Sequence, residues 1–148
     1  GMWGLFDGKL TGVSHDRGEA YTGLYNAKDY TLTATLIPKM GTEHRILTRV
    51  QGAIRSYSVG LSKDNKLVIE KNDNGFTTLA SANYEWSFGN EYTLSVKCYG
   101  AKIEVYDASG KLLIEYEDTQ NPWLYGCIGA GVKEGSRCYY ADFIIESS

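Results

Sequence analysis

The feature that most constrains the fold is a repeated alternation of apolar and polar residues, which runs from Glu19 to Glu146 and is interrupted by turn sequences. In residues 28–37 (KDYTLTATLI), threonines alternate with tyrosine, leucine and alanine. A period of two is typical of a strand with one buried face. Helical spacing is hardly seen, so the pattern predicts an all-β protein.

Turn residues divide the chain into about eleven expected strands, with no helical crossover between them. Asn74-Gly75 is the strongest hairpin signal, because both residues tolerate a positive φ angle. Pro38 to Gly41 is expected to end the first of the clear strands. Many short strands at regular spacing favour a two-sheet antiparallel β-sandwich. The clearest strands are expected at residues 28–37, 44–51, 54–61, 66–71, 76–81, 92–98, 103–106, 111–117, 126–132 and 137–146.

The length of 148 residues suits one domain with a substantial core. We therefore expect a single jelly-roll domain over residues 1–148, with an N-terminal segment at 1–18 and the sandwich at 19–146. Gly1 before Met2 is typical of a residue left after an expression tag is removed.

The charge balance and the lack of a long apolar run argue against two kinds of partner. Fifteen Lys and Arg stand against eighteen Asp and Glu, a net charge of −3, and no basic run could follow a phosphate backbone. No apolar run approaches the ~20 residues that cross a bilayer. We therefore expect neither nucleic-acid binding nor membrane insertion, while the compartment stays open.

Three cysteines, Cys98, Cys127 and Cys138, match neither a metal-binding knuckle nor a disulfide framework. Buried thiols are the simplest interpretation, since free cysteine packs as a small hydrophobe. A single bridge between Cys127 and Cys138 is left open.

Nothing in the sequence provides a complete catalytic apparatus. The glycine-rich run at 126–135 has the wrong spacing for a phosphate loop, and a strand follows it in place of a helix. His15 and His44 have no partner at metal-ligand or triad spacing. The chain is therefore expected to bind, not to catalyse.

One enzymatic alternative stays open. Glu115 and Glu117 lie two apart on an expected strand and so share a face, and Asp118 follows them. Two carboxylates on one face could perform glycoside hydrolysis. Nothing near them indicates the raised pKa that a general acid needs.

Aromatic and arginine side chains are the remaining candidates for function, since the chain has twelve tyrosines and three tryptophans. Sugars present apolar C–H faces and rings of hydroxyls, which suit aromatic platforms beside planar polar groups. Core packing is the competing explanation for each ring. The predicted ligand-binding residues are Arg49, Arg55, Tyr57, Trp86, Trp123, Tyr125, Tyr139 and Tyr140.

Four segments carry a resemblance to a known family: residues 29–38 (DYTLTATLIP), 47–52 (LTRVQG), 55–57 (RSY) and 122–129 (PWLYGCIG). They resemble concanavalin A-like, laminin-G-like jelly-roll modules. In particular, they look like the non-catalytic C-terminal module of bacterial and fungal proteins of the ADP-ribosylglycohydrolase family. The domain family of 3-keto-disaccharide hydrolases is related.

The resemblance implies a curved sandwich whose concave face would hold a glycan. It does not transfer ADP-ribosyl hydrolysis, which belongs to a separate helical domain, and it implies no cofactor. Some jelly rolls carry a structural calcium ion, but no run of alternating Asp and Asn supports one here. The Glu-x-Asp-x-x-Glu motif of catalytic glucanases is absent, and residues 115–118 (EYED) depart from it.

The sequence thus predicts a carbohydrate-binding, lectin-like accessory module of a larger bacterial protein that processes glycans or ADP-ribosyl groups. Its expected partners are a glycan and the catalytic domain of that protein. Two alternatives are a structural or protein-interaction module and a glycoside hydrolase.

Overall fold

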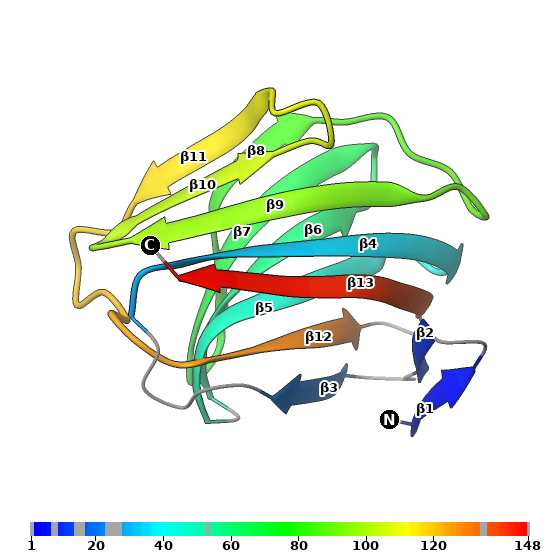
Figure 1. Ribbon diagram of the computed structural model, residues 1–148, viewed down its shortest axis with the longest axis horizontal. Helices are drawn as coiled ribbons and strands as arrows, with labels where there is room; N and C mark the ends of the chain where they lie inside the picture. Colours follow the sequence, from blue (N-terminus) through cyan, green and yellow to red (C-terminus); the bar gives the residue numbers. More distant parts are fainter. Residues whose placement is uncertain are drawn as a thin grey trace.

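The computed structural model describes residues 2–6, 9–13, 17–22, 28–52, 54–133 and 136–147. These residues form thirteen strands (Figure 1) and include no helix that could span a membrane. The strands are β1 Met2–Phe6, β2 Lys9–Val13, β3 Arg17–Thr22, β4 Tyr30–Met40, β5 Glu43–Gly52, β6 Arg55–Ser62, β7 Lys66–Asp73, β8 Phe76–Asn83, β9 Tyr92–Tyr99, β10 Lys102–Tyr106, β11 Leu112–Glu117, β12 Cys127–Lys133 and β13 Arg137–Ser147.

Two antiparallel sheets form the sandwich, as the alternation predicts. The seven-stranded sheet has the order β1-β2-β13-β4-β9-β10-β11, and the six-stranded sheet has the order β3-β12-β5-β6-β7-β8. Figure 1 looks onto the seven-stranded sheet, with β5, β6 and β7 behind it. The all-β jelly-roll prediction is therefore confirmed.

The core lies between the sheets and is built from every second residue of the central strands. Leu94 and Val96 of β9 face Ile46 of β5 and Val59 of β6 in one cluster of fully buried side chains. Burial of each such side chain contributes roughly 1.5–3 kcal/mol of hydrophobic free energy. The alternation read from the sequence thus identifies the inward faces correctly.

The expectation that Pro38 ends its strand is wrong, because β4 continues to Met40. The pairing of β4 with β9 stops at Leu36, whereas its pairing with β13 continues past Pro38. The Pro38 carbonyl accepts a hydrogen bond from the Gly89 amide, so the position without an N–H faces the side where the β9 ladder has ended. Proline is tolerated in a strand at such an edge.

Residues before Glu19, which the sequence analysis set apart from the sandwich, also contribute strands. β1 and β2 pair with each other, and β2 pairs with β13 at the edge of the seven-stranded sheet. Their short sequences, MWGLF and KLTGV, carry too little alternation to indicate a strand.

The glycine at the start of the 126–135 run is required by close packing. Gly126 has a φ of 145°, and a Cβ atom there would lie 2.3 Å from the backbone carbonyl carbon of Arg49. Gly126 is thus a position where two backbone segments approach too closely for a side chain. The described part of this run, Cys127–Lys133, forms strand β12 and not a phosphate loop.

Cys98 and Cys138 are free, buried thiols. Burial raises the pKa of the Cys98 thiol, and it raises that of Cys138 to about 12. Because Cys138 is free, the bridge to Cys127 that the sequence left open is not formed. The side chain of Cys127 and all of His15 lie outside the described residues.

Candidate functional site

The segment 118–126, which connects β11 to β12, crosses one end of the sandwich and is held in a fixed conformation. The Asp118 amide donates to the Ala101 carbonyl at 2.8 Å, and Asp118 Oδ1 accepts from the Gln120 amide at 3.0 Å. Asn121 has a φ of 51°, a left-handed conformation that asparagine tolerates. The same short stretch therefore fixes its own turn before it reaches Trp123.

A buried ammonium group anchors this segment to β7. Lys71 Nζ lies 2.6 Å from Asp118 Oδ2 and donates to the carbonyls of Gln120 at 2.7 Å and Asn121 at 2.9 Å. An ammonium has three donors, and these three oxygens use all of them. Lys71 thus ties the 118–126 segment to β7.

Tyr57 of β6 joins this cluster from the core side. Its hydroxyl donates to Asp118 Oδ2 at 2.7 Å and accepts from the Trp123 amide at 2.9 Å. Burial and the bond to Asp118 raise the pKa of Tyr57. Burial works to raise the pKa of Asp118 as well, but hydrogen bonds from Lys71, Tyr57 and the Gln120 amide outweigh it and lower that pKa.

The half-buried indole of Trp123 is held by one hydrogen bond and flanked by two cations. Trp123 Nε1 donates to the Asn72 carbonyl at 3.2 Å. Lys71 Nζ lies 4.8 Å from the ring centroid, and the exposed guanidinium of Arg55 lies 5.5 Å from it. The structure therefore brings together three of the predicted residues, Arg55, Tyr57 and Trp123.

An open hollow lies beside this cluster, between β7, β8 and β11, and has a volume of about 410 Å³. We call it the Lys71 hollow. Within the described part of the chain, the side chains of Thr77, Thr78, Gln120 and Asn121 make no hydrogen bond and are available to a ligand. The lining residues are Lys71, Asp73, Thr77, Thr78, Leu79, Tyr116, Asp118, Gln120 and Asn121.

Tyr116 and Leu79 supply the apolar part of this wall. Both side chains are partly buried and pack against the core cluster, so their positions are fixed by the sandwich. An apolar wall beside hydroxyl and amide groups suits a polyhydroxylated ring, which has C–H faces and many hydrogen-bonding groups.

Arg49, a predicted binding residue, lies wholly inside the protein, with 0% of its side chain exposed. Its guanidinium donates to the carbonyls of Gly100, Lys28 and Trp123, the last two at 3.0 Å. Arg49 itself has a φ of 49°, where the β5–β6 register shifts. Arg49 therefore connects three segments at this end and does not line the hollow.

None of the eight predicted residues is among those that line the Lys71 hollow, and Tyr57, like Arg49, is fully buried. Tyr125 is 44% exposed on the same loop, and its carbonyl accepts from Gln51 Nε2 at 2.9 Å. Tyr140 is fully buried and donates to the Gly131 carbonyl at 2.7 Å. Tyr139 is partly buried with Lys39 Nζ 4.9 Å from its ring. Trp86 lies beside a second hollow, at the opposite end of β6 and β7.

Lys71, Gln120 and Asn121 were not selected from the sequence, and Asp118 was considered there only for the hydrolase alternative. One signal could have found Lys71: β7 places Leu67 and Ile69 in the core, and the next inward position is a lysine. A charged residue at an inward position of a strand needs a buried partner.

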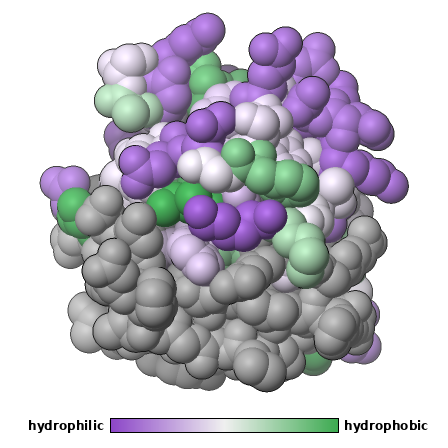
Figure 2. Space-filling model, turned by 90° about the vertical axis from the view of Figure 1, so that its right-hand side faces the viewer, coloured by the Kyte–Doolittle hydropathy of each residue, from purple (hydrophilic) through white to green (hydrophobic). Residues whose placement is uncertain are grey.

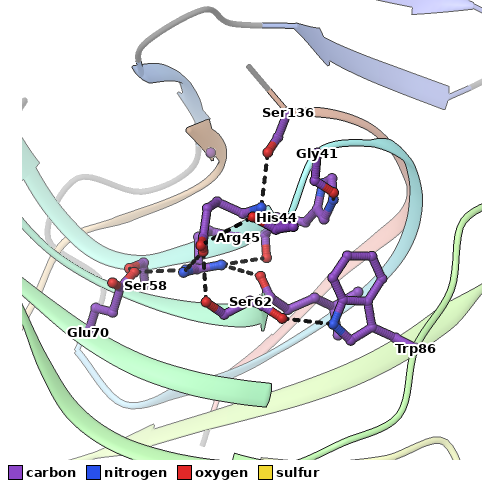
Figure 3. Close-up of polar contacts among 12 residues, drawn as sticks. Gly41, His44, Arg45, Ser58, Ser62, Glu70, Trp86 and Ser136 are labelled. Atoms are coloured by element: carbon purple, nitrogen blue, oxygen red, sulfur yellow. Dashed lines mark hydrogen bonds and ion pairs between the residues drawn. The ribbon is translucent and has the colours of Figure 1, made fainter. Parts of the chain in front are cut away.

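A second polar cluster that sequence reasoning missed centres on Arg45 (Figure 3). Arg45 Nε donates to Glu70 Oε1 at 2.7 Å, and Arg45 Nη2 donates to Glu43 Oε2 at 2.6 Å. Ser58 donates to Glu70 Oε1 at 3.1 Å, and Ser62 donates to Glu43 Oε2 at 2.8 Å. With Arg45 only 3% exposed, this cluster is a bonded network and not an open site.

The Arg45 cluster lies on the outer face of the six-stranded sheet. Ile46, Val59 and Ile69, which are next to its members along the strands, belong to the core. Side chains of successive strand residues point to opposite faces, so the cluster points away from the core.

The carboxylates of the hydrolase alternative do not form a catalytic pair. Glu115 and Glu117 are exposed on β11, and Glu115 lies 3.7 Å from the Lys102 ammonium. Asp118 is buried, with a lowered pKa, whereas a general acid needs a raised one. Among the described residues, no group of three or more His, Cys, Asp or Glu could hold a metal ion.

No family model and no curated protein matches the sequence. Several solved structures do match the chain in fold. The carbohydrate-binding module CBM66 from Bacillus subtilis aligns with a TM-score of 0.89 and 18% identity over 99% of this chain and 92% of that one. A putative glycosyl hydrolase from Parabacteroides distasonis aligns with a TM-score of 0.70 and 17% identity over 99% and 90%. The galectin LEC-6 of Caenorhabditis elegans aligns with a TM-score of 0.60 and 12% identity over 94% and 97%.

At these identities the comparisons establish the fold. The chain is a jelly-roll β-sandwich of the kind found in a carbohydrate-binding module and in galectins.

Proposed function

We propose that the chain is a non-catalytic carbohydrate-binding module and that its ligand occupies the Lys71 hollow. The observation that carries the proposal is the pairing, in one open hollow, of an apolar wall with four side chains whose hydrogen-bonding groups are unused. The names of two structural neighbours, a carbohydrate-binding module and a galectin, support the same ligand class.

The contacts follow from the chemistry of the wall. The C–H face of a sugar ring packs on Tyr116 and Leu79, while Thr78 and Gln120 bond to its hydroxyls. The ligand lies at this sheet edge and not on the outer face of the six-stranded sheet, because the Arg45 cluster there is closed by its own bonds.

The proposal extends to an accessory role in a larger bacterial protein that processes glycans or ADP-ribosyl groups. The resemblance of residues 29–38 and 47–52 to the C-terminal modules of ADP-ribosylglycohydrolase-family proteins supports that context. The module would then hold the catalytic domain of that protein close to a glycosylated substrate.

Glycan-array screening followed by calorimetry tests the binding function. Gln120→Ala and the isosteric Thr78→Val remove hydrogen-bonding groups from the hollow, and each is expected to weaken binding about fivefold to tenfold. Thr31→Val, on β4 of the other sheet, is the matched control and should bind as the unmodified chain does. Absence of binding across plant, host and bacterial polysaccharides at high protein concentration would refute the function.

A protein-interaction role is the second candidate, because exposed apolar side chains lie at the same end of the sandwich. Ile54 and Leu124 are each 48% exposed, and Tyr125 is next to Leu124. Light scattering and co-purification with the parent enzyme separate the two roles. A sugar module should be monomeric and should not require Ile54, whereas Ile54→Ser would weaken a protein contact.

A further inference from the structure

A second hollow lies at the opposite end of the β6–β7 hairpin and also has a volume of about 410 Å³. We call it the Trp86 hollow. It is formed by the β6–β7 turn and by the segment between β8 and β9, on the side of the molecule that Figure 2 shows. Polar side chains surround a few apolar ones on the coloured part of that face. The lining residues are Asn65, Glu85, Trp86, Ser87 and Tyr92.

The indole of Trp86 is held rigidly beside this hollow. Trp86 Nε1 donates to the Ser62 carbonyl at 2.9 Å, as Figure 3 shows. The ring meets His44 edge to face at a centroid distance of 5.3 Å and meets Phe88 in the same manner at 5.8 Å. An aromatic ring fixed in this way loses little conformational entropy when a ligand binds.

The backbone around Trp86 is also fixed before any ligand arrives. The Trp86 amide donates to Asn65 Oδ1 at 3.3 Å, and the Ser87 amide donates to the Tyr92 hydroxyl at 2.7 Å. Asn90 Nδ2 donates to Ser87 Oγ at 2.6 Å. The segment therefore presents its hydroxyl and amide groups in one arrangement.

A half-buried tryptophan lies at each end of the β6–β7 hairpin: Trp86 lines its hollow, and Trp123 lies beside the Lys71 hollow without lining it. Trp86 donates its indole N–H to the carbonyl of Ser62, at the end of β6, and Trp123 donates its indole N–H to that of Asn72, near the end of β7. The extended backbone from Lys66 to Asn72 spans about 20 Å. The hairpin thus holds two half-buried tryptophans at a fixed separation.

We infer that the Trp86 hollow is a second glycan site and that the chain binds two segments of an uncharged polysaccharide at once. This inference rests on the proposed function of the Lys71 hollow. Among the described lining residues of the Trp86 hollow, Glu85 is the charged one, and its carboxylate disfavours an acidic sugar there. Two sites on one chain can join separate polysaccharide strands or bind one strand with increased avidity.

Binding stoichiometry tests the inference. The probes are cellotriose, xylotriose, mannotriose and 1-kestose, which are uncharged and too short to reach from one hollow to the other. Calorimetry should give two sites per chain for a probe that binds. The double variant Thr78→Val/Gln120→Ala should retain the second site with a stoichiometry of one.

Glu85→Gln and Trp86→Phe test the second hollow itself. Both should weaken that site about fivefold or more while leaving the first unchanged, and Glu85 is exposed, so its substitution leaves the fold intact. Lys111→Ala, in the exposed turn between β10 and β11, is the control. Thermal unfolding of each variant confirms that it is folded.

The outcomes separate the two proposals. A stoichiometry of one that is abolished by Thr78→Val/Gln120→Ala would overturn the second site and leave the proposed function intact. A single site that is lost only in the Trp86 and Glu85 variants would place the ligand in the Trp86 hollow and overturn the Lys71 hollow. No binding of any probe or polysaccharide would overturn both.

Discussion

The ammonium of Lys71 lies 4.8 Å from the centroid of the Trp123 indole while it also bonds to the loop that carries that tryptophan. One buried charge therefore sets both the path of the 118–126 segment and the position of its ring. The carboxylate of Asp118 balances this charge at 2.6 Å.

Replacing Lys71 with methionine should destabilise the protein. The change leaves the Asp118 carboxylate and two loop carbonyls without their buried donor, which costs about 3 kcal/mol. Urea unfolding followed by tryptophan fluorescence measures the loss. Lys63→Met, at an exposed turn, is the control and should change the free energy of unfolding by less than about 0.5 kcal/mol. Equal stabilities of the two variants would contradict the anchoring role.

Arg49→Met should destabilise the protein more than Arg55→Met does. Arg49 is fully buried and donates to the carbonyls of three separate segments, so its removal costs about 3–5 kcal/mol. Arg55 is exposed, and its contact with Trp123 is worth about 0.5–1 kcal/mol. Chemical denaturation of both variants makes the comparison, and a larger loss for Arg55→Met would show that the assignment is wrong.

Stability should fall as the pH is lowered from about 6.5 to 4, because of His44. Burial, with a smaller contribution from the Arg45 charge, lowers the pKa of His44 to about 4, although the hydrogen bond to the Gly41 carbonyl and the Glu43 carboxylate raise it. In that range the unfolded chain binds a proton that the folded chain does not, so protonation favours unfolding. The full effect is about 3 kcal/mol.

The His44→Gln variant removes this titration. Its free energy of unfolding, measured at several pH values, should depend less on pH between 6.5 and 4 than that of the unmodified chain. His44 Nδ1 makes no hydrogen bond within the described residues, so no other contact of that atom is lost. Parallel pH profiles for the two proteins would rule out His44 as the cause.

Uncharged oligosaccharides should bind the Lys71 hollow about tenfold more tightly than uronic acid oligosaccharides of equal length. The charges of Lys71 and Asp118 neutralise each other at 2.6 Å, so the carboxylate of Asp73 is the unbalanced charge among the described lining residues, and it repels an anion. Calorimetry with xylohexaose and with hexagalacturonate tests this. Asp73→Asn should reduce this difference in affinity. Tighter binding of hexagalacturonate than of xylohexaose by the unmodified chain would contradict the preference for uncharged sugars.

Arg45→Met should cost about 3 kcal/mol of stability, since it leaves two buried carboxylates without their cation. The triple variant Arg45→Met/Glu43→Gln/Glu70→Gln removes those charges and should recover part of the loss. Equilibrium unfolding of both variants measures the coupling free energy between Arg45 and the two carboxylates. A triple variant less stable than Arg45→Met would mean that the carboxylates stabilise the sheet by some other contact.

Alternation along the chain was sufficient to predict strands β4 to β13 and their inward faces, because one buried face imposes a period of two, but it missed β1 and β2. It failed at Arg49, where a left-handed residue shifts the β5–β6 register and turns the guanidinium inward. A local distortion of this kind depends on the neighbouring strand and leaves no mark in the pattern.

The candidate site was only partly predictable. Aromatic and arginine content identified Arg55 and Trp123, which the structure places together. The hollow beside them is formed by β7, β8, β11 and the 118–126 segment, which are distant in the sequence. These elements come together because the two sheets close against each other at one edge. Residue type alone does not specify which sheet edges lie together.

Gly126 limits how this end of the protein can change. Its α-carbon passes so close to the Arg49 backbone that no side chain fits there. Directed evolution of new specificities could therefore randomise residues 119, 120 and 125 freely, but a library that also varies position 126 would be filled mostly with chains that cannot close the loop.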